Sequence, residues 1–242
     1  MRLNVYVAKS LGLSRRRADT FIKDGKVEVN GDIITNPGFT VGDAHRVKVK
    51  SREISPSKHI YVIFNKPKGV TTTRSSVFKD KNIFYFLPRR FKKLFPVGRL
   101  DKNSTGLLIL TNDGQLCYKV THPRFEVEKE YLVKITGTIN KSHIIKARDG
   151  LVDAGDILKV KKIHIEGKGL SDTLLKVIVT EGKKRHLRRL FKKLGRPVIS
   201  LKRTRISRLA LGNLKEGNYK ILQREEIYAL LKLGGGAVSP AV

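Results

Sequence analysis

The sequence predicts an α+β protein of two domains, and three patterns support this prediction. The first 50 residues show apolar residues at helical spacing and then the alternation of a β-hairpin. A polar stretch over 51–58 contains Pro56 and indicates a linker. Several runs rich in β-branched residues follow and predict a sheet. We therefore expect a small domain at 1–50, a linker at 51–58, a larger domain at 59–233 and a disordered tail at 234–242.

Two short helices open the small domain. Leu3, Val7 and Leu11 lie on one face of the first predicted helix. Ser14 is a favourable N-cap for the second helix, which we expect to end at Gly25. Because the hairpin pattern comes directly afterwards, the small domain is expected to have two helices followed by a hairpin.

Strands account for most of the remaining pattern. Asn30-Gly31 suits the positive φ angles of a type I′ turn and predicts the hairpin of the small domain, to which "HRVKVK" adds a strand. Asp113-Gly114 predicts a second hairpin turn, after the strand "GLLIL". Further strands are predicted in "HIYVIFNKPKG", "KEYLVKITG", "DILKVKKIHI" and "LLKVIVTEG". A helix is predicted over 184–194, with an apolar face formed by Leu187, Leu190, Phe191 and Leu194.

The composition indicates a polyanionic partner. The 242 residues include 51 Lys and Arg but 21 Asp and Glu, so the formal net charge is +30. A charge of this size favours binding to nucleic acid, and 40% apolar residues suffice for a packed core. No stretch approaches the roughly 18 apolar residues of a membrane-spanning helix, and we expect no membrane association.

The sequence offers little to a metal ion or a cofactor. Cys117 is the one cysteine, so a disulfide or a zinc cluster within the chain is excluded, and we expect a cytoplasmic protein. Cys117 itself is expected to be a small buried side chain. No grouping of His, Asp and Glu indicates a metal site, and neither a phosphate-binding loop nor a dinucleotide fingerprint occurs. We therefore expect no cofactor and no metal.

Three consecutive arginines, Arg15, Arg16 and Arg17, open the second predicted helix. Guanidinium groups beside the free amides of a helix N-terminus suit phosphate binding, although a merely solvated basic face would show the same residues. The whole stretch "RLNVYVAKSLGLSRRRADTFIKDGKVEVNG" resembles the alpha-L RNA-binding motif found in a small-subunit ribosomal protein and in many RNA-modifying enzymes. This resemblance implies that the small domain binds RNA.

Asp101 has two possible roles. It precedes the strand "GLLIL", and by spacing alone it would only shape a turn. However, "GRLDKNSTGLLILTNDG" resembles the signature of the pseudouridine synthases of the small- and large-subunit ribosomal RNA type, in which this Asp is catalytic. Two further motifs of that family are similar to "KEYLV" and to "EGKKRHLRRLFKKLG" followed by "LKRTRI", in the same order. The resemblance covers the chain to about residue 230.

The resemblance implies a fold, an activity and three catalytic residues. The larger domain would contain a mixed, mainly antiparallel sheet flanked by helices, and the protein would convert a flipped-out uridine of ribosomal RNA to pseudouridine. Asp101 would be the catalytic carboxylate, Tyr131 the ring that stacks on the base, and Arg188 the cation that keeps Asp101 ionised. Helical geometry alone leaves Arg188 and Lys193 open, since they lie on opposite borders of the apolar face. A core aromatic is the alternative for Tyr131.

We expect RNA contacts from both domains. The segment 183–208 holds 12 Lys and Arg and no acid, and neutralising phosphates with such a segment supplies affinity with little sequence selectivity. Lys66 and Lys68, with Thr71–Arg74, are candidates to clamp flanking RNA, or else they form a plain strand-end turn. The predicted RNA-binding residues are Arg15, Arg16, Arg17, Lys66, Arg99, Lys183, Arg185, Arg189, Lys202, Arg203 and Arg205.

Four further polar residues are not expected to act directly on the substrate. Asn103 and Thr105 are expected to fix the Asp101 loop through hydrogen bonds. His186 stands where many members of the family have Gln. We expect His186, like His122, to be a polar loop or edge residue and not a general base.

Together these patterns predict a two-domain pseudouridine synthase. "THPRFEVEKEYLVKI" resembles the large-subunit enzymes more than the small-subunit one, so we favour a uridine of large-subunit ribosomal RNA. The expected partner is ribosomal RNA or a ribosomal subunit assembly intermediate, and the expected state is a monomer. The alternative is a non-catalytic ribosomal RNA-binding or ribosome-assembly protein, and the intact set of Asp101, Tyr131 and Arg188 argues against it.

Overall fold

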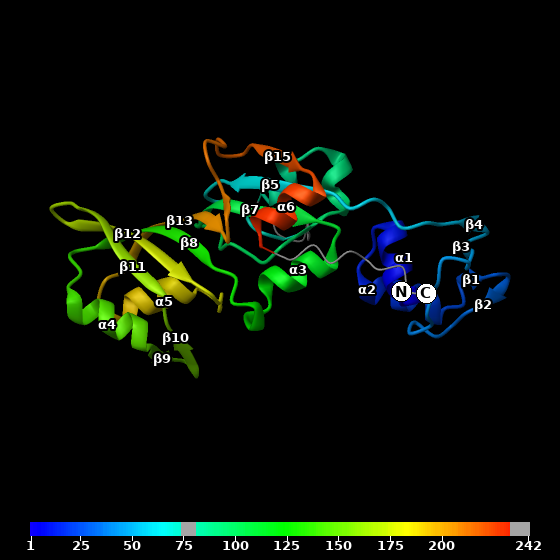
Figure 1. Ribbon diagram of the computed structural model, residues 1–242, viewed down its shortest axis with the longest axis horizontal. Helices are drawn as coiled ribbons and strands as arrows, with labels where there is room; N and C mark the ends of the chain where they lie inside the picture. The colour runs from blue at the N-terminus through cyan, green and yellow to red at the C-terminus, as the bar shows by residue number, and fades with distance from the viewer. Residues whose placement is uncertain (74–80, 233–242) are drawn as a thin grey trace. The chain divides into compact units, whose positions relative to one another are not determined.

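The computed structural model describes residues 1–73 and 81–232 and divides the chain into two compact units (Figure 1). The first unit is Met1–His59, and the second begins at Ile60. Arg74, at the end of one predicted RNA-contacting stretch, and the predicted tail at 234–242 lie outside the described residues. The described residues form one hydrophobic core in the first unit and two in the second.

Two helices and a small antiparallel sheet form the first unit. Helix α1 (Leu3–Leu11) ends at Gly12, whose backbone is left-handed, and α2 (Arg15–Lys23) begins after Ser14, whose hydroxyl accepts a helix N–H. Asn30 and Gly31 both have positive φ, as the predicted hairpin turn requires. The sheet has the strand order β2-β1-β3-β4, with bounds β1 (Val27–Val29), β2 (Asp32–Ile33), β3 (Val47–Val49) and β4 (Arg52–Glu53).

Strand β4 corrects the predicted start of the linker. It pairs antiparallel with β3, so residues 52 and 53 belong to the sheet of the first unit. The backbone N–H of Ile54 donates to the Val47 carbonyl, and the Tyr6 hydroxyl donates to the Ile54 carbonyl. Polar composition alone indicated a linker here, but the backbone groups of this segment complete the edge of a sheet.

A mixed sheet with the strand order β11-β12-β8-β13-β7-β5-β15 is the frame of the second unit. Within the described residues β13 pairs with β7 in parallel, and the other neighbours on this path pair antiparallel. The bounds are β5 (Tyr61–Lys66), β7 (Thr105–Thr111), β8 (Lys129–Thr136), β11 (Lys162–Lys168), β12 (Asp172–Val179), β13 (Val198–Ile206) and β15 (Tyr219–Leu222). Short strands β6 (Phe95–Pro96) and β14 (Leu209–Ala210) add to β7 and β13, and β9 (Leu151–Asp153) pairs with β10 (Asp156–Leu158) as a separate ribbon.

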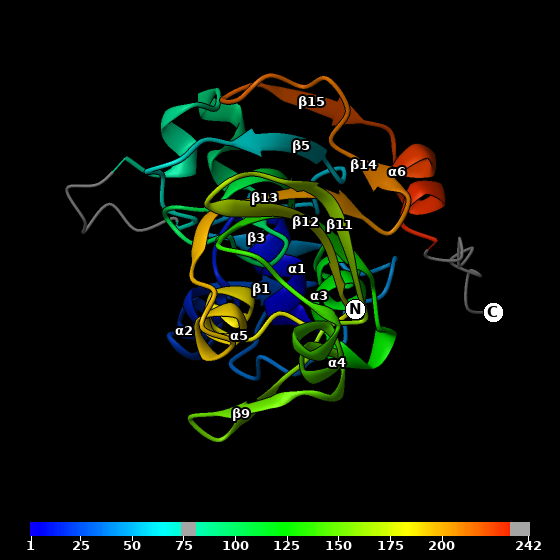
Figure 2. The same ribbon diagram turned by 90° about the vertical axis from the view of Figure 1, so that its left-hand side faces the viewer.

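Strands β5 and β7 are buried on both faces, which explains their unbroken apolar runs. Phe64 and Leu108 belong to the core on one face of the sheet, whereas Ile63 and Leu107 belong to the core on the other. Helices α4 and α5 contribute to the first core and lie beneath β11 and β12 in Figure 2. Helices α3 and α6 contribute to the second core. The bounds are α3 (Gly114–Thr121), α4 (Lys141–Asp149), α5 (His186–Lys193) and α6 (Arg224–Leu230), with 3₁₀ turns at Ile83–Tyr85, Arg89–Lys93 and Pro123–Phe125.

The predicted hairpin turn at Asp113-Gly114 is wrong, because these residues begin helix α3. Asp113 is the buried N-cap, and its Oδ1 accepts two backbone N–H groups from the first turn of the helix. Its Oδ2 accepts the hydroxyl hydrogens of Tyr61 and Tyr228. Aspartate serves both turns and N-caps, so the dipeptide could not tell the two apart. Cys117 in this helix is partly buried against the second core.

Candidate active site

Asp101 lies in a short loop, Leu100–Ser104, that leads into β7. The backbone N–H of Ser104 donates to the Asp101 carbonyl at 3.0 Å, so the loop contains the tight turn that the spacing predicts. The Thr72 hydroxyl donates to the Leu100 carbonyl at 2.8 Å and ties the loop to the chain after β5. The Asp101 side chain is 34% exposed and is therefore accessible to a substrate.

Lys66 holds the same loop from inside the protein. Its side chain is fully buried, and its ammonium donates to the carbonyls of Pro67, Lys102 and Ser104 at 2.9, 3.2 and 2.7 Å. Burial lowers the pKa of Lys66 to about 8, although the Asp101 carboxylate opposes this shift. The predicted RNA contact of Lys66 is therefore corrected, because its charge is directed at loop carbonyls in the interior.

Helix α5 brings Arg188 to the Asp101 loop. Arg188 Nε lies 3.8 Å from Asp101 Oδ2, and Nη2 donates to the Asn103 carbonyl at 3.1 Å. Burial lowers the pKa of Arg188, and the Asp101 carboxylate opposes this effect. The other candidate on the border of the apolar face, Lys193, lies 3.7 Å from Asp153 instead. The tertiary structure thus pairs Asp101 with Arg188, as the resemblance implies.

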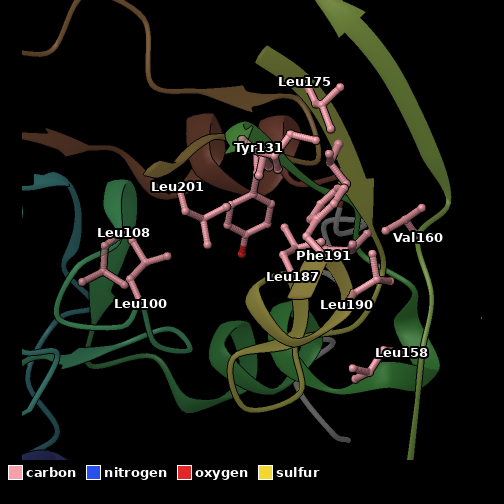
Figure 3. Close-up of a cluster of buried hydrophobic side chains, with 14 of the residues drawn as sticks. Leu100, Leu108, Tyr131, Leu158, Val160, Leu175, Leu187, Leu190, Phe191 and Leu201 are labelled. Carbon is pink, nitrogen blue, oxygen red and sulfur yellow. The ribbon is translucent and has the colours of Figure 1, made fainter. Parts of the chain in front are cut away.

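A small pocket of about 80 Å³ opens beside this ion pair, and both Asp101 and Tyr131 line it. Tyr131 lies on β8 and is 9% exposed. Figure 3 shows its ring between Leu201 and Leu187, which also line the pocket. The ring is therefore part of the core and a wall of the pocket at once, so the two interpretations of Tyr131 are compatible.

Arg203, another predicted RNA contact, is buried. It is 3% exposed, and its Nε donates to the Leu107 carbonyl at 2.7 Å. Strands β7 and β13 approach closely here, since a Cβ added at Gly106 would lie 2.2 Å from the Arg203 carbonyl oxygen. The RNA contact of Arg203 is therefore corrected to a role inside the sheet.

The other predicted RNA contacts fall into three groups. Arg189 is paired with Asp153 and Asp156 of the β9–β10 ribbon, and Arg205 is paired with Glu130, so these charges are partly neutralised within the protein. Lys183 and Lys202 are partly exposed. The exposed group consists of Arg15, Arg16, Arg17, Arg99 and Arg185, and Arg99 and Arg185 line the Asp101 pocket.

The expectation that His186 is a polar loop or edge residue is wrong. His186 is the first residue of α5 and is buried, and its ring nitrogen Nε2 lies 2.9 Å from the Lys159 carbonyl oxygen. Glu181, which we did not single out from the sequence, also lines the pocket. Both residues lie in the quoted motif, and Arg185 between them has a left-handed backbone (φ 52°) that no local sequence pattern predicts.

The described residues contain no group of three His, Cys, Asp or Glu side chains that could hold a metal ion. Among the helices described, none has the length and apolar character needed to cross a bilayer. A larger hollow of about 560 Å³ is lined by residues from α4 and by Lys159 and Lys161, and its lining excludes Asp101, Tyr131 and Arg188. The paired carboxylate and arginine therefore make the smaller pocket the better candidate for chemistry.

Residues 60–193 match the family model described as RNA pseudouridylate synthase, and residues 1–47 match that of the S4 domain. The chain belongs to the RNA pseudouridylate synthase family. This synthase is 32% identical over 234 residues to the ribosomal large subunit pseudouridine synthase B of Bacillus subtilis (strain 168), covering 96% of each chain. It is 34% identical to a dual-specificity RNA pseudouridine synthase of Salmonella typhi, covering 99% of this chain and 82% of that relative.

A solved structure supports the same assignment. The crystal structure of a pseudouridylate synthase matches this synthase with a TM-score of 0.66 and 27% identity, over 95% of this chain and 99% of the other. The predicted α+β fold and the predicted enzyme class are confirmed, and the synthase isomerises uridine in RNA. The S4 domain and the family together support RNA as the substrate.

Proposed function

We propose that this synthase acts on a uridine of ribosomal RNA and that Asp101 is the catalytic carboxylate. The observation that carries the proposal is the Asp101–Arg188 pair, with 3.8 Å between Oδ2 and Nε, beside a pocket that Tyr131 lines. A carboxylate and an aromatic ring thus line one small space, and the arginine lies next to the carboxylate. These are the groups needed to hold a base and to react with its nucleoside.

The reaction breaks the bond between C1′ and N1 and joins C1′ to C5, so its atoms balance without a cofactor. An ionised carboxylate can attack C6 or C1′, or it can take a proton from C2′. Each route needs a carboxylate oxygen that the substrate can reach. The 3.8 Å contact from Arg188 is longer than a hydrogen bond, so the arginine supplies positive charge without a short N–H bond to Oδ2.

The pocket is proposed to receive a flipped-out base, with the Tyr131 ring stacked on it. Extrusion of a base costs a few kcal/mol, and contacts to the RNA backbone must offset this cost. Arg99 and Arg185 are exposed and line the pocket, so we assign to them the phosphates that flank the target. The exposed arginines at the start of α2 supply further affinity for RNA.

Two features favour large-subunit ribosomal RNA as the substrate. The Bacillus subtilis relative that carries this specificity in its name aligns over 96% of each chain, and "THPRFEVEKEYLVKI" resembles the large-subunit enzymes. The Salmonella typhi relative is named for dual specificity, and therefore the assay should include RNAs other than ribosomal RNA. The monomeric state and the cytoplasmic location stay predictions.

The test combines a deletion strain with purified RNAs. Pseudouridine is mapped in the host's ribosomal RNA after complementation with wild type, Asp101→Asn, or Asp149→Asn as an exposed acidic control in the same domain. We expect wild type and Asp149→Asn to restore the same site, and Asp101→Asn to lower the rate by ~10⁴-fold or more. Restoration by Asp101→Asn would disprove the catalytic assignment. Activity only on a non-ribosomal RNA would disprove the proposal that the substrate is ribosomal RNA.

A further inference from the structure

Four side chains at the carboxyl end of α3 form a surface cluster that the proposed reaction does not use. The cluster comes from α3, its C-cap and the 3₁₀ turn that follows, and it consists of Tyr118, His122, Arg124 and Phe125. We call it the Tyr118 cluster. Tyr118 is 43% exposed, and His122 and Arg124 are also exposed. Phe125 packs against the second core and anchors the cluster to the protein.

The rings of the cluster hold the guanidinium group of Arg124. The Tyr118 and Phe125 rings pack edge to face with 5.6 Å between their centroids, and the His122 ring lies 4.9 Å from that of Tyr118. Arg124 Cζ lies 5.0 Å from the Tyr118 centroid and 4.6 Å from the Phe125 centroid, as in a cation–π contact. Within the described residues no carboxylate forms an ion pair with Arg124, so its charge stays available to a ligand.

Short-range hydrogen bonds fix the backbone beneath the cluster. The His122 N–H donates to the Tyr118 carbonyl at 2.9 Å, and His122 Nδ1 accepts the backbone N–H of Arg124 at 3.3 Å. The Phe125 N–H donates to the His122 carbonyl at 3.2 Å. A ligand would therefore meet side chains that are already arranged, and its binding would cost little entropy for ordering the protein.

The Tyr118 cluster lies beside the candidate active site. Thr121, the last residue of α3, is next to Gly98, because a Cβ built at Gly98 would lie 3.5 Å from Thr121 Cγ2. The residue after Gly98 is Arg99, which is exposed and lines the Asp101 pocket. The 3₁₀ turn of the cluster leads into β8, on which Tyr131 lines the same pocket. RNA held at Arg99 can therefore reach the cluster within a few nucleotides.

We propose that the Tyr118 cluster binds one unpaired nucleotide of the RNA near the target uridine. The Arg124 guanidinium donates to its phosphate, and the exposed rings of Tyr118 and His122 stack on its base. Proteins stack the bases of single-stranded RNA on such rings and on guanidinium planes, with little selectivity for the base. The net charge of +30 favours RNA over a protein partner. The approach of the RNA past Arg99 rests on the function proposed above.

Tyr118→Trp gives the cluster its own fluorescent reporter, because the chain contains no tryptophan. Single-stranded oligouridylate should quench its emission about twofold or more, whereas an RNA duplex should quench it far less, since duplex bases are already stacked. Tyr85→Trp is the matched control, because Tyr85 is 69% exposed and Lys81 Nζ lies 4.9 Å from its ring centroid. Equal quenching of the two variants would overturn the proposal. Equal quenching by oligoglutamate would also overturn it and indicate an acidic protein partner.

The same reporter measures the contribution of Arg124. In the Tyr118→Trp background, Arg124→Gln should raise the oligouridylate concentration for half-maximal quenching about tenfold, because it removes both the phosphate contact and the guanidinium plane. Arg90→Gln removes the same charge and is the control, since Arg90 is also exposed and its Cζ lies 4.9 Å from the Phe91 ring centroid. It should change this concentration within about twofold. Equal losses in the two variants would show non-specific attraction and overturn the proposal.

Turnover of the RNA substrate tests whether the cluster serves the reaction. Tyr118→Leu and Arg124→Gln should each raise KM about fivefold and leave kcat within about twofold, because the cluster binds RNA equally before and during the reaction. Unchanged KM in both variants would overturn the proposal, and these two variants decide if Tyr118→Trp does not fold. A wrong assignment of the substrate to ribosomal RNA would leave the fluorescence results unchanged, so the two failures are distinguishable.

Discussion

Two consecutive arginines of α5 face different parts of the second unit and make different ion pairs. Arg188 lies 3.8 Å from Asp101 and gives its hydrogen bonds to groups that include the Asn103 carbonyl. Arg189 bonds directly to the carboxylates of Asp153 and Asp156 on the β9–β10 ribbon, the latter at 2.7 Å. The shorter and more numerous carboxylate contacts therefore lie on the side of the helix that faces away from the candidate active site.

The difference fits the roles that we propose for the two pairs. Short bonds from Arg189 occupy carboxylate oxygens and fasten the ribbon to the helix. A reacting carboxylate must keep an oxygen accessible, and the longer contact from Arg188 satisfies that requirement while it still brings positive charge close. Arg188→Gln and Arg189→Gln separate these two kinds of contact, and Lys66→Met tests the support of the Asp101 loop.

Replacement of Arg188 has the largest expected effect. Arg188→Gln removes the charge beside Asp101, and we expect kcat to fall about 10²- to 10³-fold, the usual loss when one electrostatic stabiliser is removed. KM for RNA should change little, since the exposed arginines remain. Steady-state kinetics on the RNA substrate checks this result, with Arg189→Gln as the matched control from the next position. Equal losses in the two variants would contradict the division of roles.

Lys66→Met tests whether the Asp101 loop needs its internal support. The variant keeps a long buried side chain but loses the bonds to the Pro67, Lys102 and Ser104 carbonyls. We expect kcat to fall by roughly 10- to 100-fold, because a small displacement of a catalytic group is costly. Lys66→Arg keeps the charge but not the fit, and serves as the comparison. An unchanged kcat in Lys66→Met would show that the loop is rigid without this lysine.

The same variant has a pH signature in stability. The folded-state pKa of Lys66 is lowered to about 8, below its ordinary value of 10.5, so the unfolded chain binds the proton more tightly. The free energy of unfolding of wild type relative to Lys66→Met should therefore rise as the pH increases from about 8 towards 10.5. Urea unfolding at both ends of this range measures the difference.

Arg189→Gln has the smallest expected effect on activity, with kcat within about threefold of wild type, because its contacts are to the ribbon. The Arg189 bond lowers the pKa of Asp153, so this pair stabilises the fold at neutral pH and loses its contribution as the pH falls through that lowered pKa. The stability difference between wild type and variant should thus be present at pH 7 and shrink below about pH 4. Urea unfolding at pH 7 and 3.5 tests this, and a difference that grows in acid would refute it.

Local patterns predicted a large part of the fold. The spacing of Leu3, Val7 and Leu11 predicts α1, and Asn30-Gly31 predicts the hairpin turn, because each depends on residues close together in the chain. Where a local signal served two structures, the prediction was wrong, as at Asp113, which caps a helix and does not turn a hairpin. The prediction that the linker begins at residue 51 is wrong for a similar reason, since the composition of this polar segment does not show that it pairs with β3.

By itself the sequence determined the helices and the hairpin of the small domain, the large excess of positive charge and the motif that contains Asp101. Only the tertiary structure decided where the charges lie: Arg188 and not Lys193 lies close to Asp101, and Lys66 and Arg203 are buried. The physical reason is that a charged side chain has the same local pattern whether it meets solvent, a carboxylate or a buried carbonyl. Its environment is set by strands and loops that are distant in the chain and come together only in the folded protein.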